Sequence, residues 1–173
     1  IQCYHGTVHG VVDFKKSFAK SCNTSFANIG LSLDRNKFGE TLDTLLFNEK
    51  LPVSFQHSVS RLEVSDATSD SDMMQIAIGQ GAASITPLQL NMITCAIANE
   101  GKLMKPYLVD CVKNSAGSNI KEFKPVAYGN LISGKEAEIM SGLMKSVVEE
   151  GTASRLSGLS YTAAGKTGSA EYG

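Results

Sequence analysis

The feature that most constrains the fold is a helix start in the middle of the chain, Thr86-Pro87-Leu88-Gln89. Threonine is a favoured N-cap, proline is well tolerated in the first turn, and glutamine three residues after the cap completes a capping box. Gly101 follows the helix as a stop signal. The apolar residues between these signals lie on more than one side, which predicts a buried helix: Leu88, Met92, Cys95, Ala96 and Ala98. The core must therefore form around this central helix.

Other helix signals lie on both sides of this segment. Asp13 is an N-cap for a helix that carries Phe14 and Phe18. A second helix is expected after residue 25 and a third over residues 36–48, whereas residues 51–72 lack a sustained period and predict a long exposed loop. Ser133 and Glu136 form a capping box that opens a helix running to Gly151.

Strand signals come late in the chain. Residues 107–112 and 120–123 flank a Ser- and Gly-containing turn and predict a β-hairpin, and a final strand is expected over residues 161–171. Helices in the middle and strands near the end predict an α+β fold, with residues 1–173 forming a single domain or part of one.

The final stretch contains Lys166-Thr167-Gly168-Ser169. In a strand, Lys166 and Gly168 share one face, and a ligand can lie against the backbone of a glycine that has no side chain. A lysine charge and a threonine hydroxyl beside it suit an anionic substrate such as a peptide carboxylate. The Lys-Thr-Gly triplet also occurs by chance in many proteins, so it needs a second signal.

The second signal is Ser21-Cys22-Asn23, because Ser-x-Asn with a distant Lys-Thr-Gly makes up two thirds of the signature of penicillin-recognising serine enzymes. Two helices that meet at a polar corner let Ser21 and Asn23 project into a cleft; alternatively, both residues only cap the second helix. The chain resembles the transpeptidase domain of class B penicillin-binding proteins over residues 13–27, 79–101, 106–109 and 147–171. The most specific blocks are Gly79-Gln-Gly81 with the central helix start, and Gly151-Thr152-Ala153.

The resemblance implies part of a β-lactamase/transpeptidase-like fold, in which a helical subdomain packs on strands of an antiparallel sheet. The family's nucleophile lies in a Ser-x-x-Lys motif before Ser-x-Asn, and the family continues with a further strand and helix after Lys-Thr-Gly. We therefore expect residues 1–173 to be a partial domain, incomplete at both ends and inactive by itself.

The resemblance also implies roles for individual residues. Ser21 would relay a proton to the leaving or attacking amine, Lys166 would keep that network charged, and Asn23 would hydrogen-bond a substrate amide. Thr167 would bind the substrate carboxylate, and the backbone N–H of Ser169 would be one oxyanion donor. The candidate site thus consists of catalytic Ser21, Asn23 and Lys166 and substrate-binding Thr167, Gly168 and Ser169, with no metal and no cofactor.

The activity that the resemblance implies is that of a peptidoglycan D,D-transpeptidase, which cross-links stem peptides through a serine acyl-enzyme and is inhibited by β-lactam antibiotics. A β-lactam sensor or a non-catalytic penicillin-binding homologue is the alternative, and a hydrolytic β-lactamase fits the central helix block less well. The parent protein would be anchored by an N-terminal segment on the extracytoplasmic face of the bacterial membrane, in a cell-wall synthesis complex. The net charge of −1 provides no excess positive charge to bind nucleic acid.

A second Ser-x-x-Lys match, Ser17 to Lys20, lies in the wrong place. If the helix begins near Asp13, the N–H of Ser17 already bonds the carbonyl four residues back and cannot serve an oxyanion hole. Lys20 also directly precedes Ser21, so the two motifs cannot face each other across a cleft. We therefore do not expect Ser17 to be the nucleophile.

The four cysteines are Cys3, Cys22, Cys95 and Cys111. Disulfides are possible outside the cytoplasm, but the positions of Cys22 in a motif and Cys95 in an apolar helix favour free, buried thiols. Cys3, His5 and His9 with Cys22 match no standard zinc-binding spacing, so no metal site is expected.

Overall fold

The computed structural model describes residues 1–169; Ala170 and Glu171, the end of the expected final strand, lie outside the described residues. The helices are α1 (Phe14–Ala19), α2 (Asn23–Ser32), α3 (Arg35–Thr44), α4 (Asp70–Ala77), α5 (Pro87–Ala98) and α6 (Gly134–Glu149). Short 3-10 helices are η1 (Tyr4–Gly6) and η2 (Ser154–Leu156), and the strands are β1 (Lys102–Met104), β2 (Cys111–Lys113), β3 (Asn119–Glu122) and β4 (Ala127–Asn130). The predicted α+β class is confirmed.

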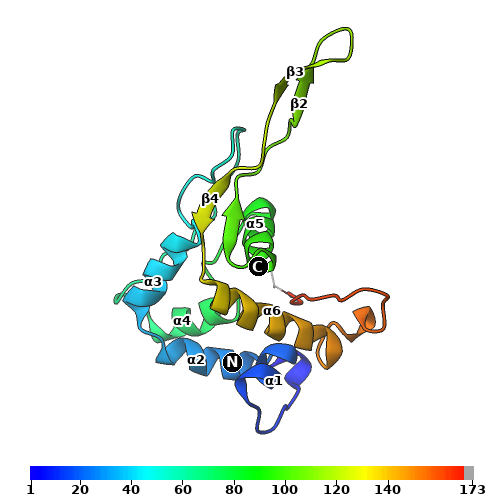
Figure 1. Ribbon diagram of the computed structural model, residues 1–173. Helices are drawn as coiled ribbons and strands as arrows, with labels where there is room; N and C mark the ends of the chain where they lie inside the picture. Colours follow the sequence, from blue (N-terminus) through cyan, green and yellow to red (C-terminus); the bar gives the residue numbers. More distant parts are fainter. Residues whose placement is uncertain (170–173) are drawn as a thin grey trace.

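The strands of the described chain form two small antiparallel sheets, β1 with β4 and β2 with β3. The register of the first pairs Leu103 with Gly129. The β2–β3 hairpin confirms the turn signal, since the Asn114 side chain accepts hydrogen bonds from the N–H groups of Ala116 and Ser118. Figure 1 shows this hairpin projecting away from the helices, while α1, α2, α4 and α6 lie together at the opposite end.

Two hydrophobic clusters hold the middle of the chain. One joins α3 and α4 through Leu42, Phe47, Leu62, Val64, Met73 and Ile76. The other packs α5 on β1 and on the residue that follows β4, through Leu46, Leu51, Met92, Ala96, Leu103 and Leu131. The prediction of an exposed loop over residues 51–72 is wrong in part, because Ser60, Leu62 and Val64 are buried. These three alternate with exposed residues, and Arg61 pairs with Ser84 as an isolated bridge.

The N-cap signals formed as predicted at two helices and in part at a third. Asp13 caps α1, and Ser133 and Glu136 make both bonds of a capping box. Thr86 accepts from the Gln89 N–H, but the Gln89 side chain turns into the core and donates to the Leu45 carbonyl instead. Helix α3 ends at Thr44, short of the predicted residue 48.

Helix α5 is less enclosed than predicted. Its buried residues, Gln89, Met92 and Ala96, lie on one face, whereas Leu90 and Cys95 are exposed. The prediction of a helix buried on more than one side is wrong, because α5 packs on β1 and α6 along one face only in the described part of the chain.

The expected final strand is also absent from residues 161–169, which have no regular secondary structure. A strand needs a ladder to a neighbour, and the recorded backbone bond of this segment is a single one, from the Gly165 N–H to the Met144 carbonyl of α6. The segment instead runs back along α6 (Figure 1). Within residues 1–169, no helix has both the length and the apolar character needed to cross a bilayer.

Candidate active site

Ser21 lies at a sharp corner between α1 and α2. Its φ of 52° is left-handed, a conformation that non-glycine residues adopt rarely and that recurs at functional sites. Two backbone bonds hold the corner: the Ser21 N–H donates to Phe18, and the Cys22 N–H donates to Ser17. The N-cap of α2 is Cys22, whose side chain makes no capping bond, so the alternative that Ser21 and Asn23 merely cap this helix is wrong.

Lys166 meets this corner from the other end of the chain. Its ammonium donates a hydrogen bond to the Ser21 hydroxyl at 2.8 Å, across a sequence separation of 145 residues. A second bond to the Thr167 carbonyl, at 2.9 Å, fixes the side chain's direction. The fold therefore places Ser-x-Asn beside Lys-Thr-Gly, as the two motifs predicted.

The Lys166 ammonium is only partly in water, although much of the residue is exposed. It lies 5.9 Å from the centre of the Phe18 ring. Partial burial lowers the pKa of Lys166 from its usual value, because a desolvated cation loses hydration. A hydroxyl that accepts a hydrogen bond from such an ammonium can give its own proton to a neighbouring amine while it takes one from the ammonium.

The Thr167 hydroxyl is held by Thr152, the middle residue of the Gly151-Thr152-Ala153 block, with the two oxygens 2.6 Å apart. The loop that carries Thr152 is itself clamped between two helices. The Thr152 N–H donates to the Ala19 carbonyl of α1, and the Ala153 N–H donates to the Val147 carbonyl of α6. Lys20 adds a bond to the Glu150 carbonyl.

This arrangement explains why a glycine precedes Thr152. A Cβ at residue 151 would lie 2.2 Å from the Ala19 carbonyl oxygen and 2.7 Å from that of Val147. Only glycine allows both carbonyls to approach so closely. The sequence marked this block as specific without assigning it a role; the structure shows that it connects Thr167 to the Ser21 corner.

Two further contacts involve predicted residues. The Asn23 side-chain NH₂ donates to the Gln2 carbonyl at 3.1 Å, so this amide is tied to the start of the chain. The Gln80 side chain donates to the Ser169 carbonyl at 3.3 Å, which joins the Gly79-Gln-Gly81 block to the end of Lys-Thr-Gly-Ser. Gln80 belongs to the Gly79-Gln-Gly81 block, but the sequence did not predict that it would contact the site. The roles of Asn23, Gly168 and Ser169 stay predictions.

Ser17 is enclosed within α1. The residue is 2% exposed, and its N–H donates to the Asp13 carbonyl at 2.9 Å. Both observations agree with the expectation that Ser17 has neither the access nor the free N–H that a nucleophile in an oxyanion hole requires.

The four cysteines are free, and Cys22 is buried, as expected. Cys95 is exposed, so the prediction of its burial is wrong, and Cys3 is also buried. Burial raises the pKa of the Cys3 thiol, but hydrogen bonds from Thr24 and Cys22, together with the nearby His9 side chain, outweigh this and bring the pKa to about 7. The structure also brings together three residues whose spacing had argued against a metal site, Cys3, His9 and Cys22, while His5 is not part of the group.

Comparison with known proteins agrees with this geometry. Residues 2–173 match the family described as penicillin binding protein transpeptidase domain. The chain belongs to this family, as its resemblance to class B members implied.

Two curated relatives are similar over nearly the whole chain. Peptidoglycan D,D-transpeptidase PbpA of Mycolicibacterium smegmatis is 29% identical over 162 residues, which are 94% of this chain and 33% of that protein. Stage V sporulation protein D of Bacillus subtilis is 26% identical over 173 residues, 99% of this chain and 27% of that protein. The chain thus spans about a third of the length of these relatives.

A solved structure, the ceftriaxone acyl-enzyme complex of penicillin-binding protein A from Mycobacterium tuberculosis, superposes with a TM-score of 0.83. It is 26% identical, and the match covers 94% of this chain and 36% of that one. The fold of the described residues is therefore that of part of a penicillin-binding transpeptidase domain.

Proposed function

We propose that this chain is part of a peptidoglycan D,D-transpeptidase that cross-links stem peptides through a serine acyl-enzyme and reacts with β-lactams. The observation that carries the proposal is the 2.8 Å bond between Lys166 and Ser21, which joins the two family motifs. The names of the relatives support the activity: PbpA is a peptidoglycan D,D-transpeptidase, and penicillin-binding protein A forms a ceftriaxone acyl-enzyme.

Acyl transfer by a serine requires a proton to leave the nucleophile and another to reach the departing amine. Ser21 is suited to the second step, because its hydroxyl can donate to the amine while Lys166 donates to its oxygen. The same pair can take a proton back from the attacking amine when the acyl group is transferred onward. Ser17 takes no part, and the nucleophile comes from the family's Ser-x-x-Lys motif.

Substrate binding falls to the Lys-Thr-Gly-Ser segment. The Thr167 hydroxyl, oriented by Thr152, donates to the terminal carboxylate of a stem peptide or to the acid group of a β-lactam. The positive charge of Lys166 lies in the neighbouring residue and strengthens this contact. Asn23 binds a substrate amide, and the Ser169 N–H contributes to the oxyanion hole.

The location and partners follow from this activity. The stem peptides of peptidoglycan lie outside the cytoplasm, so the parent protein acts on the extracytoplasmic face of the bacterial membrane. We place it there through an anchor in the parent protein, in a complex that synthesises the cell wall.

The test uses the full-length parent protein with a purified stem-peptide donor and acceptor, and cross-linked product is measured by mass spectrometry. Wild type should form product and Ser21→Ala should lose most of it, while Ser32→Ala, on the exposed side of α2, should match wild type. Acylation by penicillin without any cross-linking in the wild type would contradict the enzyme assignment and favour a sensor.

A further inference from the structure

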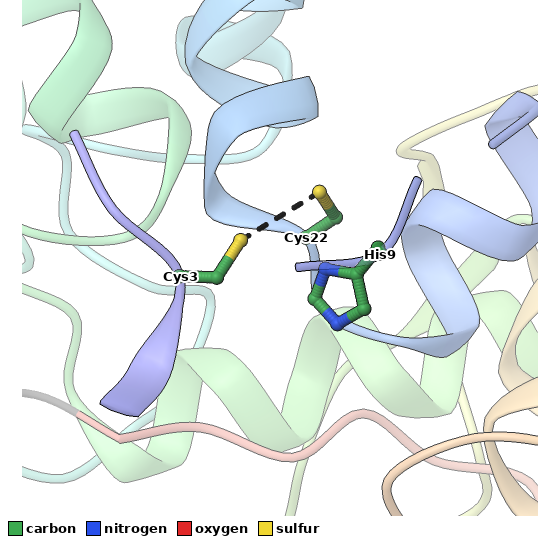
Figure 2. Close-up of side chains that lie close together, drawn as sticks. All are labelled: Cys3, His9 and Cys22. Atoms are coloured by element: carbon green, nitrogen blue, oxygen red, sulfur yellow. Dashed lines mark hydrogen bonds between the residues drawn. The ribbon is translucent and has the colours of Figure 1, made fainter. Parts of the chain in front are cut away.

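Three potential metal ligands meet beside the Ser21 corner (Figure 2). The ligand atoms of Cys3, His9 and Cys22 all lie within 4.8 Å of one another. The two sulfur atoms are 3.7 Å apart. Two thiolates bound to one tetrahedral Zn²⁺, each at about 2.3 Å, are about 3.8 Å apart, so the sulfur spacing fits a shared ion without rearrangement.

His9 adds an independent observation. Its Nδ1 atom is buried and has no hydrogen-bond partner among residues 1–169. A buried ring nitrogen without a partner is unusual and calls for an explanation such as an ion. Figure 2 shows the His9 ring and the sulfur atoms of Cys3 and Cys22 gathered in one place.

The burial pattern of residues 1–11 points the same way. Tyr4, Val8 and Val11 are exposed, although apolar side chains would normally anchor such a segment. Cys3 is buried and His9 is half-buried, so the residues that face inward are a thiol and an imidazole. A segment whose metal ligands face inward and whose apolar side chains face solvent can be held in its folded position by a bound metal ion.

We propose that Cys3, His9 and Cys22 bind one Zn²⁺ through two thiolates and one imidazole, with the fourth position filled by a ligand from outside the described residues. Zinc fits this donor set, because sulfur and imidazole ligands in a tetrahedral arrangement are those it prefers. The two thiolate charges balance the charge of the ion, so the buried group is neutral overall and its desolvation cost is small. The site is separate from the acyl-transfer groups, so it extends the proposed function and does not depend on it.

The position of the site gives it a consequence for the active site. Cys22 lies between Ser21 and Asn23, and the Asn23 side chain already bonds the Gln2 carbonyl next to Cys3. An ion held by Cys3 and Cys22 therefore ties the start of the chain to the Ser-x-Asn corner. It stabilises the left-handed conformation of Ser21.

The experiment measures zinc in the full-length parent protein, purified under reducing conditions and dialysed with Zn²⁺ and then against a weak chelator. We expect about one Zn²⁺ per chain in the wild type. Cys3→Ser and Cys22→Ser should lose it, whereas the matched controls Cys95→Ser and His5→Gln should keep it. Co²⁺ in place of Zn²⁺ should give a thiolate-to-metal charge-transfer band in wild type and controls, and none in Cys3→Ser or Cys22→Ser.

A second measurement needs no variant and covers the case in which a substitution prevents folding. Iodoacetamide labelling of the wild type, mapped by mass spectrometry, should spare Cys3 and Cys22 when Zn²⁺ is bound and modify both after chelation. Cys95 should react equally in both conditions. Zinc-independent labelling, a wild type without zinc, or a disulfide-linked Cys3–Cys22 peptide from the reduced preparation would each overturn the proposal.

Discussion

Replacing Gly151 with alanine tests whether the Thr152 loop positions the site. The added Cβ would lie 2.2 Å from the Ala19 carbonyl oxygen and within 2.8 Å of two Val147 backbone atoms. Each of these contacts is with backbone, so no side chain can rotate away, and α1 and α6 must separate or the loop must lift.

The magnitude follows from two costs. Overpacking a tight site costs about 1–3 kcal/mol, and the bond from the Thr152 N–H to the Ala19 carbonyl, if lost, costs about 1 kcal/mol more. We therefore expect Gly151→Ala to lower the free energy of unfolding by about 2–4 kcal/mol. Because Thr152 would also be displaced from Thr167, acylation should slow, by about 10²-fold if the shift reaches about 1 Å.

Gly142→Ala is the matched control. Gly142 lies in α6, is exposed and has nothing within 4 Å of an added Cβ. Because alanine has the higher helix propensity, Gly142→Ala should raise the free energy of unfolding by about 0.5–1 kcal/mol. Pulse proteolysis across a urea series gives the stability of both variants in the full-length protein, and fluorescent penicillin gives the acylation rate. If Gly151→Ala is as stable and as reactive as Gly142→Ala, the clamped loop does not position the site.

Three further outcomes are expected. Thr152→Val should slow penicillin acylation about fivefold, the equivalent of one neutral hydrogen bond, and Thr152→Ser should restore it; equal rates for the two variants would contradict a role for the hydroxyl. Because burial lowers the pKa of Lys166, rising pH should remove its charge earlier than it would for a fully hydrated lysine. Acylation should therefore fall on the alkaline side, where the cost of burying the charge also disappears, and a Lys166→Met variant should lack this alkaline decline. Zn²⁺ at one hundred times its dissociation constant should raise the free energy of unfolding by about 2.7 kcal/mol in the wild type and not in Cys3→Ser, as read from thermal shift; equal shifts in both would argue against Cys3 as a ligand.

Local signals in the sequence predicted five of the six helices in the described chain, but α4 was missed, and its first residues lie in the segment expected to be a loop. N-caps depend on side chains within a few residues, which is why Asp13, Thr86 and Ser133 marked helix starts correctly. Gln89 shows the limit of such signals. Its side chain donates a hydrogen bond to the distant Leu45 carbonyl and therefore does not complete the local capping box. The alternation of Ser60, Leu62 and Val64 was a period-two pattern that could have revealed their burial.

Non-local features were harder to predict. The motifs that carry Ser21 and Lys166 could be paired because their residue types are specific to the family, although no rule of spacing connects positions 145 residues apart. No such pattern exists for Cys3, His9 and Cys22, whose grouping depends on how residues 1–12 fold back on the α1–α2 corner. The final strand was mispredicted for a similar reason, since a strand depends on a partner that composition does not specify.

The most direct test of the central claim is the rate of acylation of the full-length protein by a fluorescent penicillin after Lys166→Ala. The substitution removes a charged hydrogen bond to Ser21, worth about 1.5–3 kcal/mol, so the rate should fall by about 10- to 10²-fold. Lys145→Ala, at an exposed lysine of α6, should react like the wild type. A Lys166→Ala rate within about threefold of the wild type, less than about 0.7 kcal/mol, would contradict the claim that Lys166 and Ser21 act together in the site.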